Sequence, residues 1–176
     1  MGKTLLLLRH GKSDWDADYS EDHERPLAPR GVRAAKLMGR LLADARQVPD
    51  LAISSTALRS RNTLELAIES GSWTCPMQSD HALYETDPDS VLERLQNLPP
   101  EVSSVLLAGH ECTWSELTAL LIGGGRIRIP TAAVVRIDFE REYWKNIQSG
   151  DGELVWLQIP RFFKKPSKTD AIQSAS

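Results

Sequence analysis

Leu5-Leu6-Leu7-Leu8-Arg9-His10-Gly11 joins a short apolar run to a cation, an imidazole and a glycine. Consecutive leucines in so short a run predict a strand that is buried on both faces. In an open α/β sheet, ligands bind beyond the carboxyl ends of the strands, so Arg9 and His10 should lie where such a fold does its chemistry. Arginine binds phosphate through two donors, and neutral histidine is a competent nucleophile near neutral pH. The stretch therefore suggests phosphoryl transfer through a phosphorylated histidine.

Strand-like and helix-like segments alternate along the rest of the chain. Helices are expected where apolar residues recur at intervals of three and four, and strands where short apolar runs lie between turn residues. The polar segment 12–30 contains Pro26 and Pro29 and is expected to be a long loop beside the site. This alternation predicts an α/β fold, a three-layer α/β/α sandwich with a mostly parallel central sheet. The expected helices are 31–47, 89–98 and 114–122, together with a segment that Ser55 or Thr56 caps and that runs to about residue 70. The expected strands are 5–8, 51–54, 102–108, 132–139 and 153–159, together with an edge strand within 73–82.

The length of 176 residues favours one domain with a single sizeable core, which we expect to span residues 1–163. Residues 164–176 are polar and are expected to form a disordered tail. A net charge of −3 gives no general attraction to nucleic acid or to a membrane, so any anion site must be a local basic cluster. Cys75 and Cys112 form no C-x-x-C pair and are expected to be free thiols. The leucine run is too short for a signal peptide or a membrane span, which predicts a cytoplasmic protein.

Three apolar runs lead into residues that can bind phosphate. They are 5–8 with Arg9 and His10, 51–54 with Arg59 in the helix that follows, and 105–108 with Gly109 and His110. Because parallel strands end at the same edge of a sheet, two arginines and two histidines should meet there. Helix N-termini near Ser55 and His110 would add backbone N–H donors for an anion. His23 and His81 share no ligand spacing with the other two histidines, so neither a metal nor a cofactor is expected.

Several motifs resemble those of the histidine phosphatase superfamily, which has the phosphoglycerate mutase-like fold. Residues 8–11 resemble its R-H-G signature, residues 55–63 its S-x-x-x-R-x-x-x-T segment, and residues 105–110 its later G-H segment. The chain is most similar to the small SixA-type phosphohistidine phosphatases. That similarity extends from about residue 3 to residue 163 and rests on 9–15, Arg25-Pro26-Leu27, Arg30-Gly31, Leu83-Tyr84, Gly109-His110 with Ser115-Glu116-Leu117, and Pro130-Thr131-Ala132.

The resemblance implies a covalent mechanism. His10 would attack phosphorus and form a phosphohistidine intermediate, which water then hydrolyses. Arg9, Arg59 and a protonated His110 would bind the phosphoryl oxygens and offset their charge in the transition state. The expected catalytic residues are therefore His10, Arg9, Arg59 and His110, together with Glu85 for the reason given below.

Residues that flank the R-H-G segment refine the expected substrate. Gly11, Ser13 and Arg25 are the candidate substrate-binding residues, and a carbonyl at Gly11 could fix the tautomer of His10. Mutases of the superfamily resemble R-H-G-E-S-x-W-N, but Lys12 and Asp16 replace the glutamate and the asparagine here. Asp16 would repel phosphate, and the chain lacks the long insertions that cover a small phosphosugar. An open site for a phosphoprotein is therefore expected.

Glu85 falls where larger members of the superfamily keep an acidic residue. An alkoxide leaving group needs a general acid, whereas the nitrogen leaving group of phosphohistidine is expelled more easily. The resemblance thus implies a phosphohistidine phosphatase that acts on a phosphorylated protein, for example a histidine-phosphotransfer domain. Two alternatives stay open at this point. The protein could hydrolyse small phosphate monoesters with Glu85 as the acid, or it could be a non-catalytic module that binds phosphoproteins.

Overall fold

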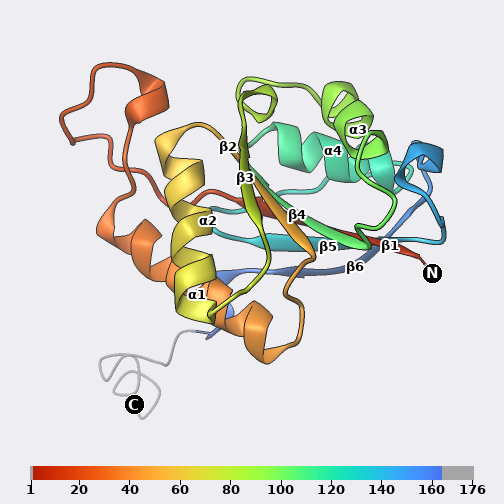
Figure 1. Ribbon diagram of the computed structural model, residues 1–176. Helices are drawn as coiled ribbons and strands as arrows, with labels where there is room; N and C mark the ends of the chain where they lie inside the picture. The colour runs from red at the N-terminus through yellow and green to blue at the C-terminus, as the bar shows by residue number, and fades with distance from the viewer. Residues whose placement is uncertain (1, 164–176) are drawn as a thin grey trace, which may run out of the picture.

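A computed structural model describes residues 2–163, and its centre is one six-stranded sheet (Figure 1). The strands are β1 (Lys3–Arg9), β2 (Leu51–Ser55), β3 (Met77–Asp80), β4 (Ser104–Gly109), β5 (Val134–Phe139) and β6 (Gly152–Gln158). They lie in the order β3-β2-β4-β1-β5-β6. The first four of these are mutually parallel, whereas β5 pairs antiparallel with β1 and β6 pairs antiparallel with β5. The mostly parallel sheet predicted from the sequence is confirmed.

Helices cover both faces of the sheet, which gives three layers (Figure 1). The helices are α1 (Pro29–Asp44), α2 (Leu58–Gly71), α3 (Pro88–Gln96) and α4 (Thr113–Leu121). Helices α1 and α2 pack together on one face, and α3 and α4 pack together on the other. The predicted three-layer α/β/α sandwich is therefore confirmed.

Strand β1 lies inside the sheet and is buried on both faces. Leu5 and Leu7 belong to the apolar core that α3 and α4 cover, whereas Leu6 and Leu8 belong to the core that α1 and α2 cover. Side chains alternate between the two faces along a strand, so a strand covered on both sides needs an unbroken apolar run. Polar side chains can follow only where the strand leaves the core, which is at Arg9.

Element boundaries differ from the prediction by a few residues. Helix α1 begins at Pro29. Proline fits the first helical turn, because the backbone N–H that it lacks would have no partner within the helix at that position. The expected cap of α2 at Ser55 or Thr56 is wrong, since the residue before the helix is Ala57 and no side chain caps it. Ser55 instead continues β2, where it is paired with Asp80 of β3. The edge strand expected within 73–82 is β3.

The predicted disordered tail, 164–176, lies outside the described residues, and the division of the chain into one domain and a tail stays a prediction. Across residues 2–163, no helix is both long enough and apolar enough to cross a membrane.

Candidate active site

The predicted site residues lie together at the carboxyl edge of the parallel strands. A pocket of about 360 Å³ opens there. The ring centroids of His10 and His110 are 5.3 Å apart. The residues predicted for the site that line this pocket are Arg9, His10, Ser13, Arg25, Arg59, Glu85 and His110. The fold thus makes neighbours of residues that the sequence separates by a hundred positions, while their catalytic roles stay predictions.

The tautomer of His10 is set by its own neighbour in the chain. Nδ1 of His10 lies 2.7 Å from the carbonyl oxygen of Gly11. A carbonyl oxygen only accepts hydrogen bonds, so Nδ1 carries the proton and the lone pair lies on Nε2. A ring held in this way can attack phosphorus through Nε2 without first losing a proton.

The surroundings also keep His10 uncharged. Burial is the largest of the effects that lower the pKa of His10 from 6.5 to about 4. The positive charges of Arg59, Arg9 and Arg25 lower the pKa as well, and the hydrogen bond to Gly11 opposes them. His10 is therefore unprotonated at neutral pH, in the form that a nucleophile requires.

His110 is also neutral in the free pocket, and the protonated form expected in the transition state stays a prediction. Burial lowers the pKa of His110 to about 3, with further contributions from His10 and Arg59. Its Nε2 lies 2.9 Å from Oγ of Ser55, the residue that was expected to cap α2. Two imidazoles beside arginines do not hold a proton without a nearby anion to offset the charge. A phosphoryl dianion in the pocket would raise the pKa of His110.

Arg9 and Arg59 each keep a buried donor that no described residue accepts. Nη1 of Arg9 donates to the carbonyl of Ile129 at 2.7 Å, and Nη1 of Arg59 donates to the carbonyl of Asp22 at 2.6 Å. The Nε atoms of both arginines are buried without a hydrogen-bond partner among the described residues. An unpaired buried donor costs about 1–3 kcal/mol, so these atoms favour an oxyanion in the pocket.

A buried hydroxyl joins the R-H-G segment to the helix that carries Arg59. Oγ1 of Thr63 accepts a hydrogen bond from the amide of Gly11 at 2.9 Å and donates to the carbonyl of Arg59 at 2.6 Å. Gly11 also packs against Gly31 at the start of α1 so closely that a Cβ on Gly11 would lie 2.8 Å from the carbonyl oxygen of Gly31. These contacts fix three separate segments of the chain around His10.

Arg25 reaches the pocket from the long loop because that loop folds back on itself. The amide of Asp14 donates to the carbonyl of Pro26, and Ser13 pairs with Leu27 across the same turn. Ser13 is buried, and its hydroxyl accepts a hydrogen bond from Nη1 of Arg25. In the free site Ser13 therefore positions Arg25, although it also lines the pocket.

Trp15 stands at the mouth of the pocket. Its ring lies against the guanidinium of Arg25, with 3.5 Å from the ring centroid to Cζ, and 62 % of the residue is exposed. Trp114, by contrast, is fully buried, and its Nε1 donates to the carbonyl of Leu8. A cation–π contact of this kind holds Arg25 in place and leaves an aromatic surface open to a ligand.

Asp22 is the residue that sequence reasoning missed. Its Oδ1 accepts from Nε and Nη2 of Arg25 at 3.1 and 2.7 Å, and its Oδ2 accepts from Nη2 of Arg59 at 2.9 Å. Partial burial works to raise the pKa of the Asp22 carboxyl, but the hydrogen bonds and charges of the two arginines outweigh it and hold the pKa below its usual value. The spacing of three residues from Asp22 to Arg25 was a signal for one ion pair. The bond to Arg59 depends on the fold.

Glu85 lies on the exposed rim of the pocket. Its φ of 50° places it in the left-handed region, which residues other than glycine seldom adopt and which occurs preferentially at functional positions. The preceding residue, Tyr84, holds its ring 5.7 Å from that of His110 and its hydroxyl 3.4 Å from Oδ2 of Asp22. The carboxyl of Glu85 is thus placed at the mouth, and its role as a proton donor stays a prediction.

The other two histidines lie beside the pocket and contact one hydroxyl. Nε2 of His23 is 2.9 Å and Nδ1 of His81 is 3.0 Å from Oγ1 of Thr56. Across residues 2–163, no group of three or more histidine, cysteine, aspartate or glutamate side chains is placed to hold a metal ion. Cys75 is half-buried and Cys112 is exposed, and both are free thiols.

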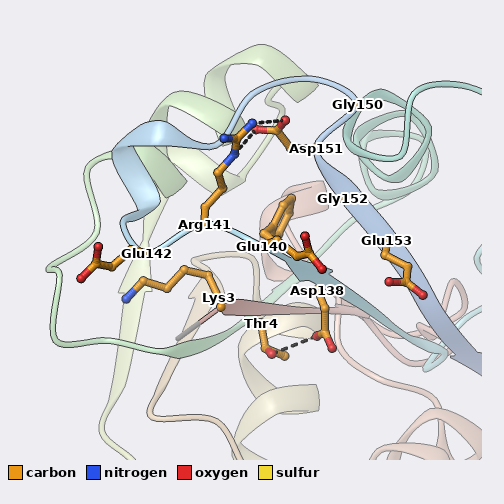
Figure 2. A pocket seen from close by; sticks show the side chains of 12 residues that line it. Lys3, Thr4, Asp138, Glu140, Arg141, Glu142, Gly150, Asp151, Gly152 and Glu153 are labelled. Atoms are coloured by element: carbon orange, nitrogen blue, oxygen red, sulfur yellow. Dashed lines mark hydrogen bonds and ion pairs between the residues drawn. The ribbon is translucent and has the colours of Figure 1, made fainter.

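A larger groove of about 1050 Å³ lies at the opposite end of β1 (Figure 2). Both cations that line it are already engaged, since Lys3 donates to two backbone carbonyls and Arg141 pairs with Asp151. An excess of carboxylates repels phosphate, so this groove is not the phosphoryl site. The carboxylates that line it are Asp138, Glu140, Glu142, Asp151 and Glu153.

The sequence of the chain matches the model of one known protein family. The family model described as histidine phosphatase superfamily (branch 1) matches residues 5–96, slightly more than half of the chain. The chain belongs to the histidine phosphatase superfamily. The matched region contains Arg9, His10 and Arg59, whereas His110 lies beyond it. The resemblance that the motifs predicted is thereby confirmed.

Relatives in the superfamily include both full-length and partial matches. An uncharacterized protein of Mycobacterium leprae is 33 % identical over 167 residues, which cover 88 % of this chain and 100 % of that protein. A 2,3-bisphosphoglycerate-dependent phosphoglycerate mutase of Afipia carboxidovorans is 35 % identical over 88 residues, 48 % of this chain and 42 % of the mutase.

Solved structures resemble the chain over nearly its whole length. The protein histidine phosphatase SixA in complex with tungstate has a TM-score of 0.79 and 26 % identity, with 92 % of this chain and 99 % of that chain covered. A candidate phosphohistidine phosphatase SixA of Nakamurella multipartitia has a TM-score of 0.78 and 26 % identity over 91 % of this chain and 97 % of that chain. The phosphoglycerate mutase-like fold is thus confirmed, and this member of the superfamily is a phosphatase.

Replacing Thr63 tests the hydroxyl that ties Gly11 to the arginine helix. Thr63→Val keeps the shape but leaves the buried amide of Gly11 unpaired, so we expect the free energy of unfolding to fall by about 1–3 kcal/mol. Thr63→Ser keeps the hydroxyl and should lose less. Urea denaturation of the three proteins measures the difference, and a valine variant at least as stable as the serine variant would contradict the assignment.

Titration of the two pocket histidines tests their lowered pKa values. Because burial disfavours the imidazolium, His10 and His110 should both stay neutral as the pH falls from about 7.5 to about 5, well below the ordinary histidine pKa of about 6.5. Nuclear magnetic resonance of the ring carbons in phosphate-free buffer measures this, with signals assigned through His10→Gln and His110→Gln. A protonation step near pH 6.5 in either ring would show that the site is more polar than its geometry indicates.

Proposed function

We propose that the protein is a SixA-like phosphohistidine phosphatase, which removes the phosphoryl group from a histidine of a phosphorylated protein. The observation that carries this proposal is the state of His10, which is neutral, has its proton on Nδ1 and lies beside arginines. This is the arrangement that covalent phosphoryl transfer to Nε2 requires. Similarity to the protein histidine phosphatase SixA supports the choice of substrate.

The reaction would proceed in two displacements at phosphorus. In the first, Nε2 of His10 forms a bond to phosphorus while the bond from phosphorus to the imidazole nitrogen of the substrate breaks. The released nitrogen takes a proton from solvent. In the second, a water oxygen replaces Nε2, a proton passes from that water to solvent, and inorganic phosphate leaves with His10 restored.

The cations of the pocket would stabilise the charge that develops on the phosphoryl oxygens. Arg9 and Arg59 each have a buried Nε that lacks a partner among the described residues, whereas Nη2 of Arg59 would have to release Asp22 before it binds a phosphoryl oxygen. His110 is neutral before substrate binds, and the arriving dianion would raise its pKa and allow it to donate a hydrogen bond. Arg25 lies at the loop side of the same pocket and would complete the set.

The protonation states of the pocket favour a nitrogen leaving group. In the free pocket at neutral pH, His110 is unprotonated and Asp22 is ionised. A proton that His110 gains when the dianion binds would be engaged by a phosphoryl oxygen and would not be available to an alkoxide. Phosphohistidine needs less assistance of this kind, because its leaving nitrogen is more easily expelled. An open mouth with an exposed tryptophan suits a protein surface, and a histidine-phosphotransfer domain in the cytoplasm is the partner class we favour.

One observation favours a second candidate function, the hydrolysis of small phosphate monoesters. The carboxyl of Glu85 lies on the rim of the pocket, where it could protonate an alkoxide leaving group. Sequence similarity to phosphoglycerate mutases, which covers about half of this chain, points the same way. Turnover of either substrate class would rule out the third reading, a non-catalytic phosphoprotein-binding module.

A paired turnover assay tests the proposed function. In the presence of a chelator, we expect phosphate release from a phosphorylated histidine-phosphotransfer domain to exceed release from p-nitrophenyl phosphate in kcat/KM. His10→Ala should lower turnover by roughly 10³-fold or more and trap no radiolabelled phosphate, because the covalent step is lost. Preference for the aryl ester would support the monoester reading instead, and label retained on the alanine variant would exclude His10 as the nucleophile.

A second experiment separates the two leaving groups. General acids typically contribute about 10²–10⁴-fold, so Glu85→Gln should lower the kcat/KM for an alkyl phosphate far more than that for phosphohistidine. The exposed Glu101, which does not line the pocket, provides the matched control Glu101→Gln. Equal slowing of ester and phosphohistidine hydrolysis would show that Glu85 does not act as the proton donor.

A further inference from the structure

A smaller hollow of about 110 Å³ adjoins the candidate active site. Lys12 and Thr131 line both the pocket and this hollow. Its remaining walls include Arg30 in the first turn of α1 and Arg161 in the short helical turn Pro160–Phe163, which contacts α1. We call the hollow lined by Lys12, Arg30 and Arg161 the basic cleft. A surface that delivers a phosphoryl group to His10 would also cover this cleft.

Within the described part of the chain, the cations of the basic cleft lack the carboxylate partner that many other arginines of the protein have. Lys12, Arg30 and Arg161 are all exposed, and none forms an ion pair with a residue in the described range 2–163. Six other arginines each pair with an aspartate or a glutamate in that range. Among residues 2–163, no carboxylate lines the cleft. In a chain with a net charge of −3, such a cluster is a local positive field.

The cleft and the adjoining pocket differ in whether their cations are accompanied by carboxylates. Three carboxylates line the pocket together with its arginines, whereas the cleft presents three cations and the hydroxyl of Thr131 without a carboxylate from residues 2–163. An acidic group of a partner would meet competing carboxylates in the pocket but none in the cleft, so the cleft can orient a partner as well as attract it.

We propose that the basic cleft docks an acidic patch on the substrate protein, next to its phosphohistidine. The inference rests on the proposed function, since it names the surface beside the phosphorylated residue. Carboxylates of the partner would pair with Arg30 and Arg161 while the phosphoryl group enters the pocket. Exposed ion pairs are individually weak and are screened by salt, so the cleft would act on substrate binding and not on the chemical step.

Charge-neutralised variants test the cleft while leaving the pocket intact. Arg30→Gln combined with Arg161→Gln removes two of its cations and keeps Lys12, which also lines the active site. The matched control is Arg33→Gln, an exposed arginine on the same helix that does not line the cleft. The substrates are two synthetic phosphohistidine peptides that differ only in carrying glutamates or glutamines beside the phosphorylated residue.

For the glutamate peptide, we expect the double variant to raise KM by about three- to tenfold at low salt with kcat unchanged, and the difference to shrink at high salt. The glutamine peptide and the Arg33→Gln control should show no change. Equal effects on both peptides, or no preference of the native protein for the glutamate peptide, would overturn the proposal. If the double variant instead lost activity only toward small bisphosphorylated compounds, the cleft would be a second phosphate subsite, and the proposal would also be overturned.

A binding measurement separates this inference from the proposed function. Calorimetry with the same peptide pair, carrying a non-hydrolysable triazole phosphonate in place of phosphohistidine, measures docking without turnover. A native protein that prefers the glutamate peptide, with that preference lost in the double variant, supports the docking surface even if phosphohistidine is not hydrolysed. Equal affinity of the native protein for both peptides refutes the docking surface even if the proposed enzymatic activity is present.

Discussion

Burial of strand β1 on both faces is the constraint on which the site depends. Four leucines fill the two cores on either side of the sheet, so the backbone of β1 leaves the interior only at Arg9 and His10. His10 consequently lies in a largely desolvated position. Desolvation keeps its ring neutral, and the carbonyl of Gly11 selects the tautomer with a free Nε2. One packing requirement thus sets both the location and the protonation state of the candidate nucleophile.

Close approach of several guanidinium groups creates a second constraint, the balance of charge. Asp22 offsets the repulsion between Arg25 and Arg59 by accepting hydrogen bonds from both. It occupies donors that a phosphoryl group would also use, so binding of substrate would require these contacts to rearrange. The pocket is therefore arranged around an anion even in its free state, with a carboxylate from the long loop already next to the arginines.

The residues around the pocket mouth, which a substrate would contact first, come from loops and helix ends and not from the sheet. The side built from Glu85 and Tyr84 follows β3, and the basic side is built from the start of α1 and the turn that follows β6. Loops and helix ends of this kind can change without disturbing the sheet, since they contribute little to its core. In a superfamily that includes both phosphatases and mutases, such rims provide a physical basis for different substrates around one phosphoryl site.

Some of these features follow from the sequence alone. An unbroken run of leucines that stops at Arg9, together with alternating helical and strand-like patterns, determined the layered fold and the edge where the candidate site residues meet, because hydrophobic periodicity is a local property. The bond from Asp22 to Arg59, the hydroxyl of Thr63 beneath Gly11 and the neutral state of His110 could not be predicted in this way. They depend on distances between segments remote in the chain and on burial, and only the tertiary structure decides those.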